Sequence, residues 1–119
     1  LHEPAVERRN ADQFYEWFAK LREKGKIRWW GLAGPIQRFA AWLGHPVARV
    51  VQVPQRDVPC LAGMGRRPQL TYGALSTRPG GRPAREALAE ALARNSAGSI
   101  IVSSRKATHL RKLVEWAER

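Results

Sequence analysis

The stretch VARVVQV (residues 47–53) has branched apolar residues at most of its positions, which is typical of a strand buried on both faces. Strands of this kind belong to parallel sheets that are covered by helices. Gln52 interrupts the run VVQV (residues 50–53), and a buried amide must find hydrogen-bond partners. Gln52 is therefore expected either to stabilise a turn or to bind a ligand.

Stretches with helical periodicity alternate with further short strands on both sides of this segment. The pattern predicts strands at 26–32, 47–53, 69–75 and 99–103, and helices at 11–24, 35–43, 84–95 and 108–119. Segment 54–68, with three prolines and two glycines, predicts a loop with little helix, and 76–83 predicts a flexible loop. Strands separated by helices form right-handed parallel βαβ units.

The expected fold class is therefore α/β, with parallel (β/α) units that make up about half of a TIM (β/α)8 barrel. Residues 1–119 are expected to form a single domain. Four parallel strands leave two exposed edges, which natural proteins usually cover or pair. The chain then needs a partner, a missing half or an unusual closure.

Composition narrows the class of protein further. A chain of 119 residues that is 44% hydrophobic and 26% charged suits one soluble domain. Its apolar runs fall well short of the roughly 20 residues that a membrane span needs, and the opening LHEPAVERRN lacks the layout of a secretory signal. The single cysteine, Cys60, allows no internal disulfide and offers no metal-ligand spacing. We expect a cytoplasmic protein with neither a membrane partner nor a metal.

The net charge of +11 favours phosphate-bearing partners, such as nucleotides, nucleic acid or an acidic surface. The positive residues are scattered along the chain rather than gathered in one block. An equally open interpretation is that these arginines only solvate helix faces.

The exit of the last expected strand carries the clearest candidate site. In GSIIVSSRKATHL (residues 98–110), Ser103 and Ser104 follow the strand, and Arg105 and Lys106 precede a helix. Hydroxyls, backbone N–H groups and a helix N-terminus together can bind an anion, and in α/β barrels a phosphate site lies after the last strands. A simple Ser or Thr helix cap with solvated cations explains the same motif.

The ordered set of segments resembles the C-terminal part of an aldo-keto reductase. The matching segments, in the order of that family, are GKIRWWGLAG, ARVVQVPQ, TYGALS and IIVSSRKATHL, preceded by LHEP, which resembles the strand that holds the active-site histidine of the family. The resemblance spans almost the whole chain and implies a (β/α)8 barrel that binds NADPH across the carboxyl ends of its strands. Segment 53–70 is shorter than is usual in the family.

The resemblance also implies a role for individual residues. His2 would orient the carbonyl oxygen of a small-molecule carbonyl substrate. Gln52 would hydrogen-bond the nicotinamide carboxamide, and Tyr72 would stack on the nicotinamide ring. The remaining residues implied by the resemblance would line the pocket of the 2′-phosphate: Ser103, Ser104, Arg105 and His109.

Three features of the chain depart from the family pattern. Ala33-Gly34 stands where the family has a Ser-Asn pair, and Lys112-Leu113 stands where it has a Glu-Asn pair near the adenine. The tyrosine acid, the lysine and the aspartate of the family lie upstream of the histidine, outside this sequence. The tyrosine donates the proton and the lysine lowers its pKa. Alone, the 119 residues are therefore expected to be inactive.

Three functions remain open from the sequence. The first is an NADP(H)-dependent oxidoreductase part that transfers a hydride between NADPH and a carbonyl or alcohol once an upstream half supplies the acid. The second is a non-catalytic half-barrel that binds a nucleotide or partner, completed by a homodimer or by a second chain. The third, which we rank last, is a basic nucleic-acid binder that uses the loops GRRP and TRPGGRP.

Overall fold

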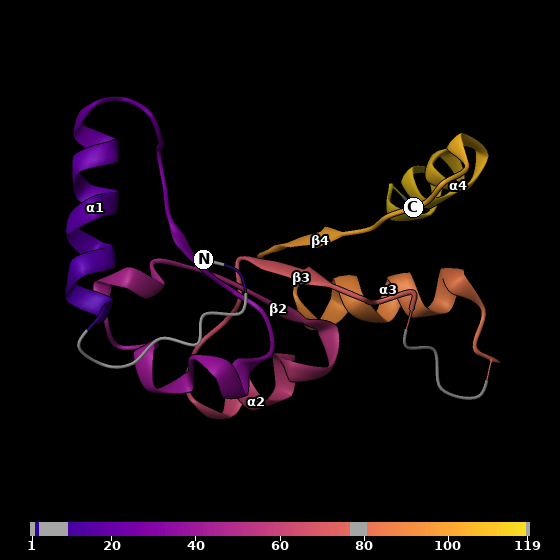
Figure 1. Ribbon diagram of the computed structural model, residues 1–119. Helices are drawn as coiled ribbons and strands as arrows, with labels where there is room; N and C mark the ends of the chain where they lie inside the picture. Colours follow the sequence, from indigo (N-terminus) through magenta and orange to yellow (C-terminus); the bar gives the residue numbers. More distant parts are fainter. Residues whose placement is uncertain (1, 3–9, 77–80, 119) are drawn as a thin grey trace.

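The computed structural model describes residue 2, residues 10–76 and residues 81–118 (Figure 1). Its helices are α1 (Ala11–Glu23), α2 (Val58–Gly63), α3 (Ala84–Arg94) and α4 (Ala107–Ala117), and its strands are β1 (Gly31–Ala33), β2 (Val50–Pro54), β3 (Leu70–Tyr72) and β4 (Ser99–Ile101). Four 3-10 turns join them: η2 (Ile36–Arg38), η3 (Ala40–Trp42), η4 (Pro46–Ala48) and η5 (Gln55–Asp57). Most of the loop expected at 76–83 lies outside the described residues.

The four strands form one parallel sheet in the order β1-β2-β3-β4. Each strand therefore pairs with the next strand along the chain, which confirms the α/β class and the parallel units. His2 continues the sheet beyond β1 through a parallel bridge to Ala33. The five segments thus follow one another across the sheet in chain order.

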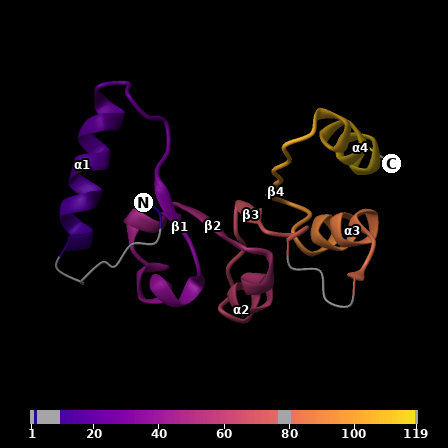
Figure 2. The same ribbon diagram turned by 45° about the vertical axis from the view of Figure 1, so that its right-hand side comes forward.

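The hydrophobic core lies on one side of the sheet, beneath β1 and β2. The buried residues that form it are Ala11, Leu32, Ile36, Phe39, Trp42, Leu43, Val47, Ala48, Val51, Val53 and Leu61. In both ribbon views α2 and the 3-10 turns lie on this side, while α1 and α4 stand at opposite ends of the molecule (Figures 1 and 2). Residues of alternate parity, such as Val50 and Leu70, point to the other side and stay partly exposed.

Segment 35–43 is not the helix that its periodicity predicts. It forms the separate turns η2 and η3, because Phe39 between them takes an extended φ of −144° and interrupts the helix. The buried Asp57 holds this arrangement, since its Oδ2 accepts a hydrogen bond of 2.8 Å from the backbone N–H of Ile36. The strand expected at 26–32 is also shorter than predicted, and Trp29 and Trp30 precede it.

The helices expected at 11–24, 84–95 and 108–119 are all present within a residue or two of their expected bounds. Helix α1 packs Phe14 and Phe18 against the core, whereas Trp17 and Leu21 remain exposed. Within residues 10–76 and 81–118, every helix is too short or too polar to cross a membrane.

The pairing of β1 with β2 requires glycine at position 31. A Cβ atom there would lie 1.8 Å from the carbonyl oxygen of Val50, a backbone atom that cannot move aside. Gly44, in contrast, has open space around the position of its missing side chain. The two glycines therefore provide a matched pair for testing the sheet.

We predict that Gly31→Ala lowers the free energy of unfolding by about 3 kcal/mol or more, because β1 must move away from β2. Gly44→Ala should change it by less than about 1 kcal/mol. Urea unfolding followed by circular dichroism measures both values. Equal stability of the two variants would contradict the close approach of the strands.

His45 connects α1 to the turn η4. Its Nδ1 accepts the Val47 N–H at 3.1 Å, so its Nε2–H donates to the Asp12 carboxylate at 2.9 Å. The imidazole thereby caps the 3-10 turn and binds the first turn of the helix at the same time. The Tyr15 and Trp42 rings lie edge-on to the imidazole, with centroids 6.2 Å away in each case.

His45→Ala should lower the free energy of unfolding by about 1–2 kcal/mol, since it removes a turn cap and a charge-assisted hydrogen bond. His109→Ala, at an exposed helix position, is the control and should have an effect within about 0.5 kcal/mol. Denaturant unfolding of the two variants makes the comparison. An unchanged free energy of unfolding in His45→Ala would show that the contact between α1 and η4 holds without this side chain.

Candidate functional site

Two adjoining cavities open where β3 and β4 end. The first, which we call the strand-end cavity, has a volume of about 360 Å³ and is lined by Tyr72, Gly73, Ala74, Leu75, Ser76, Ile101, Val102 and Ser103. The second, the α4 cavity, has a volume of about 420 Å³ and is lined by Leu75, Ala84, Ser103, Ser104, His109, Lys112, Leu113 and Trp116. Leu75 and Ser103 belong to both, so the two cavities meet at the exit of β4.

Tyr72 is the last residue of β3 and is half-buried between its neighbours in the sheet, Pro54 and Ile101. Its position in the strand-end cavity places an aromatic side chain at the carboxyl edge of the sheet. Ser103 follows the end of β4 and separates this aromatic side chain from the α4 cavity. The sequence prediction that Tyr72 and Ser103 share a site at the strand ends is consistent with this placement.

Ser104 shapes the turn that leads into α4. Its Oγ accepts the backbone N–H of Lys106 at 3.1 Å and lies 3.3 Å from the Lys106 carbonyl oxygen, to which it donates. The N-cap of α4 is Lys106, which provides no side-chain hydrogen bond to the helix. The simple Ser or Thr cap that the sequence also predicts is therefore wrong, because the N–H bonded to Ser104 is that of Lys106, which precedes the first turn of α4.

Five residues that line the α4 cavity are not among the predicted site residues, and Lys112 and Trp116 are the two of them with polar side-chain atoms. Lys112 and Trp116 follow His109 at intervals of three and four residues, so all three lie on one face of α4. This helical spacing, counted from His109, is the signal that could have found them. Arg105 is exposed and does not line either cavity.

The α4 cavity is cationic in character. Lys112 and His109 line it together with the two serines, and no carboxylate is among its described lining residues. Lys106 lies exposed at the start of the helix, where the N–H groups of the first turn face outward. The donor set therefore suits an oxyanion with several acceptor oxygens.

Gln52 lies in a different place from these residues. It sits in β2 between Ala33 and Leu70 and lines an open cavity of about 270 Å³ that also includes Trp29 and Trp30. Its amide is half-buried, so the burial expected from the sequence is only partial.

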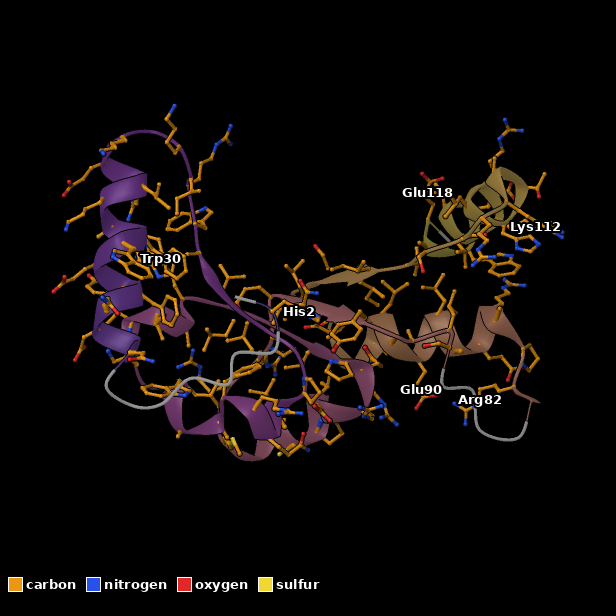
Figure 3. The ribbon with its side chains drawn as sticks, in the orientation of Figure 1. His2, Trp30, Arg82, Glu90, Lys112 and Glu118 are labelled. Atoms are coloured by element: carbon orange, nitrogen blue, oxygen red, sulfur yellow. The ribbon has the colours of Figure 1, made fainter. Side chains whose placement is uncertain are left out.

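His2 is exposed beside β1, across the sheet from α4, as the labelled side chains of His2 and Lys112 show (Figure 3). The candidate residues do not converge on a single point. They form a row in strand order, with His2 beside β1, Gln52 in β2, Tyr72 at the end of β3 and Ser103 after β4. A row of this kind suits an extended ligand better than a compact one.

The remaining reactive side chains lie outside this row. Tyr15, on α1, packs against Trp30 and His45, whose ring centroids are 5.9 and 6.2 Å from its own. Cys60 is an exposed thiol in α2. Within the described residues, His, Cys, Asp and Glu side chains form no group of three or more that could hold a metal ion.

Comparison of the chain with protein-family models, with curated proteins and with solved structures found no match.

Proposed function

We propose that this chain forms the nucleotide-binding side of an NADP(H)-dependent oxidoreductase related to the aldo-keto reductases. In this proposal the parallel sheet is about half of a (β/α)8 barrel. The observation that carries it is the row of candidate residues from His2 to the α4 cavity, which follows the order of the strands, with Gln52 within β2 and Tyr72 and Ser103 at the carboxyl ends of β3 and β4.

The sheet topology supports the barrel part of the proposal. In a (β/α)8 barrel every strand pairs in parallel with the next strand of the chain, and ligands bind at the carboxyl ends. The order β1-β2-β3-β4 has this property, and His2 marks where a further strand would join the β1 edge. The two cavities at the ends of β3 and β4 lie where such a barrel binds phosphate.

The residues at the strand ends fit NADPH in their chemistry. The adenosine 2′-phosphate would lie in the α4 cavity, where Ser103 and His109 offer hydrogen bonds, Lys112 adds a full charge and Ser104 would have to release the Lys106 carbonyl to donate as well. Tyr72 would provide the aromatic face for the nicotinamide, and Gln52 would bind its carboxamide from the neighbouring strand. The bound cofactor would supply the hydride that reduces a carbonyl substrate.

Lys112 is one of the residues that depart from the family pattern, because it stands where the family has a glutamate near the adenine. A carboxylate at this position would repel a phosphate, whereas the ammonium group attracts it. The cavity should therefore prefer adenosine with a 2′-phosphate over adenosine without it more strongly than the same cavity would with a glutamate at this position.

A titration with adenosine 2′,5′-bisphosphate and with adenosine 5′-monophosphate tests this assignment. We expect the bisphosphate to bind more tightly, and Lys112→Gln to weaken it about tenfold while changing the affinity of the monophosphate less than about twofold. Isothermal titration calorimetry measures both affinities.

Arg111→Gln is the matched control, since Arg111 is exposed on the same helix and does not line the cavity. It should bind both nucleotides as the parent chain does. Equal affinity for the two nucleotides, or an equal loss in Lys112→Gln and Arg111→Gln, would refute the assignment of the 2′-phosphate to the α4 cavity.

Catalysis requires an acid that these 119 residues do not provide. The chain has two tyrosines, of which Tyr72 is assigned to the nicotinamide and Tyr15 lies in the contact between α1 and η4. We predict that the isolated 119-residue chain binds the nucleotide without reducing a carbonyl. NADPH oxidation monitored with a reactive aromatic aldehyde tests this, and turnover above the buffer rate would contradict the need for an acid from another segment or chain.

A further inference from the structure

Cations gather at the carboxyl end of helix α1 and in the segment that follows it. Lysine or arginine occupies every second position from 20 to 28: Lys20, Arg22, Lys24, Lys26 and Arg28, all of them exposed. Glu23 is the only acidic residue between Lys20 and Trp30. We call residues 20–30, together with Arg49, the basic strip.

Two arginines of the basic strip lie against the same indole. The guanidinium carbon of Arg49 is 4.2 Å from the ring centroid of Trp29, and that of Arg22 is 5.1 Å away. Neither arginine takes part in any ion pair formed between described residues. Both guanidinium groups thus lie against one indole, and no carboxylate of the described part of the chain neutralises them.

The neighbouring indole, that of Trp30, anchors the basic strip to the core. Trp30 is buried, donates its Nε1–H to the Pro46 carbonyl at 3.0 Å and stacks on Phe18 with ring planes 20° apart. Trp29 remains 54% exposed beside it. Because the chain is fixed at Trp30, the exposed indole and its arginines keep their place at the amino ends of β1 and β2.

The spacing of the charges indicates what kind of anion fits. After α1 the chain turns and descends as irregular, drawn-out backbone to β1, and nitrogen-tipped side chains project from this end of the molecule (Figures 1 and 3). Lys20 and Arg22 lie in the last turns of α1, and Lys24, Lys26 and Arg28 follow in the chain reversal around Gly25 and the segment that leads to β1. Five exposed cations within nine residues match a polymer that carries one negative charge in each repeat unit.

We propose that the basic strip binds single-stranded nucleic acid. The cations of residues 20–28 would contact its phosphates, as in other proteins that bind single strands without sequence preference. A base would stack on the guanidinium plane of Arg49, whose other side lies over Trp29. The strip lies at the amino ends of the strands, so it is separate from the cavities at their carboxyl ends and does not depend on the proposed function.

An alternative occupant is an anionic membrane surface, because Trp17 and Leu21 are also exposed on α1. The arrangement of Trp29 favours nucleic acid. An indole that is covered by guanidinium groups offers them as stacking planes, whereas insertion into lipid would require the indole to leave them.

The test uses a fluorescein-labelled oligo(dT) strand of about 20 nucleotides, followed by fluorescence anisotropy at several salt concentrations. The triple variant Lys24→Gln, Lys26→Gln, Arg28→Gln should weaken binding at least about tenfold. It should also reduce the slope of log K against log salt by about 2, because each phosphate contact of a single strand contributes about 0.7. The single variant Arg49→Gln, which removes one charge instead of three, should also weaken binding.

The control triple variant is Arg38→Gln, Arg67→Gln, Arg85→Gln, which has the same net charge and changes exposed residues elsewhere. It should retain the affinity of the parent chain within about twofold. Circular dichroism and binding of adenosine 2′,5′-bisphosphate monitor the fold and the other site in every variant. If the two triple variants lose affinity for oligo(dT) equally, net charge alone explains the binding, and the proposal is overturned.

Two further outcomes would also overturn it. One is the absence of any binding to oligo(dT) at low salt. The other is preferential binding to vesicles that contain phosphatidylserine, with the same dependence on residues 24–28, which would assign the basic strip to a membrane surface instead.

Discussion

The main constraint on this structure is that the 3-10 turns and α2 cover only one face of its parallel sheet. Parallel strands are stable when both of their faces are shielded, and here Leu32, Val51 and Val53 provide the shielded face through their contact with the turns after β1 and β2. On the other face, Val50 and Leu70 are only partly buried, and Ile101 at the far edge is 42% exposed. The position of the core, the position of the candidate site and the open cavity beside Gln52 all follow from this one-sided cover.

The two halves of the sheet differ in how firmly they are packed. The continuous core ends at β2, and the carboxyl half buries smaller separate groups around Leu88, Ala91 and Leu113. The strand-end and α4 cavities lie in this less tightly packed half. Segments with few buried apolar contacts open at low free energy, so a ligand that contacts α4 as well as β3 and β4 would stabilise them by joining them.

The sequence predicts the strands and the three longer helices in their order, since short branched runs and long amphipathic stretches differ clearly in period. It misses the short helix α2 because the three prolines and two glycines of 54–68 indicate a loop. It fails at 35–43, where the apolar spacing is helical but a tertiary hydrogen bond from the Ile36 N–H to Asp57 and the non-helical φ of −144° at Phe39 impose two separate turns. No local pattern contains that information, because Asp57 lies 21 residues away from its partner Ile36.

For the candidate site, the sequence identifies Ser103, Ser104 and His109, which line one cavity because they follow each other closely along the chain. It places Gln52 with them only by analogy, and the structure puts this amide in another cavity across the sheet. Lys112 and Trp116 are missed because their role depends on which face of α4 turns inward. The loops GRRP and TRPGGRP attract attention by composition, whereas the convergence of Arg22 and Arg49 on Trp29 exists only in three dimensions.

The hydrogen bond between Asp57 and Ile36 has a mechanical consequence. It joins the turn that leaves β1 to the turn that leaves β2, and the carboxylate is only 6% exposed. Neither turn can swing outward alone, because that would strand a buried charge without its donor. The exits of the first two strands are therefore coupled, so that a movement of one turn must carry the other turn with it or give up this hydrogen bond.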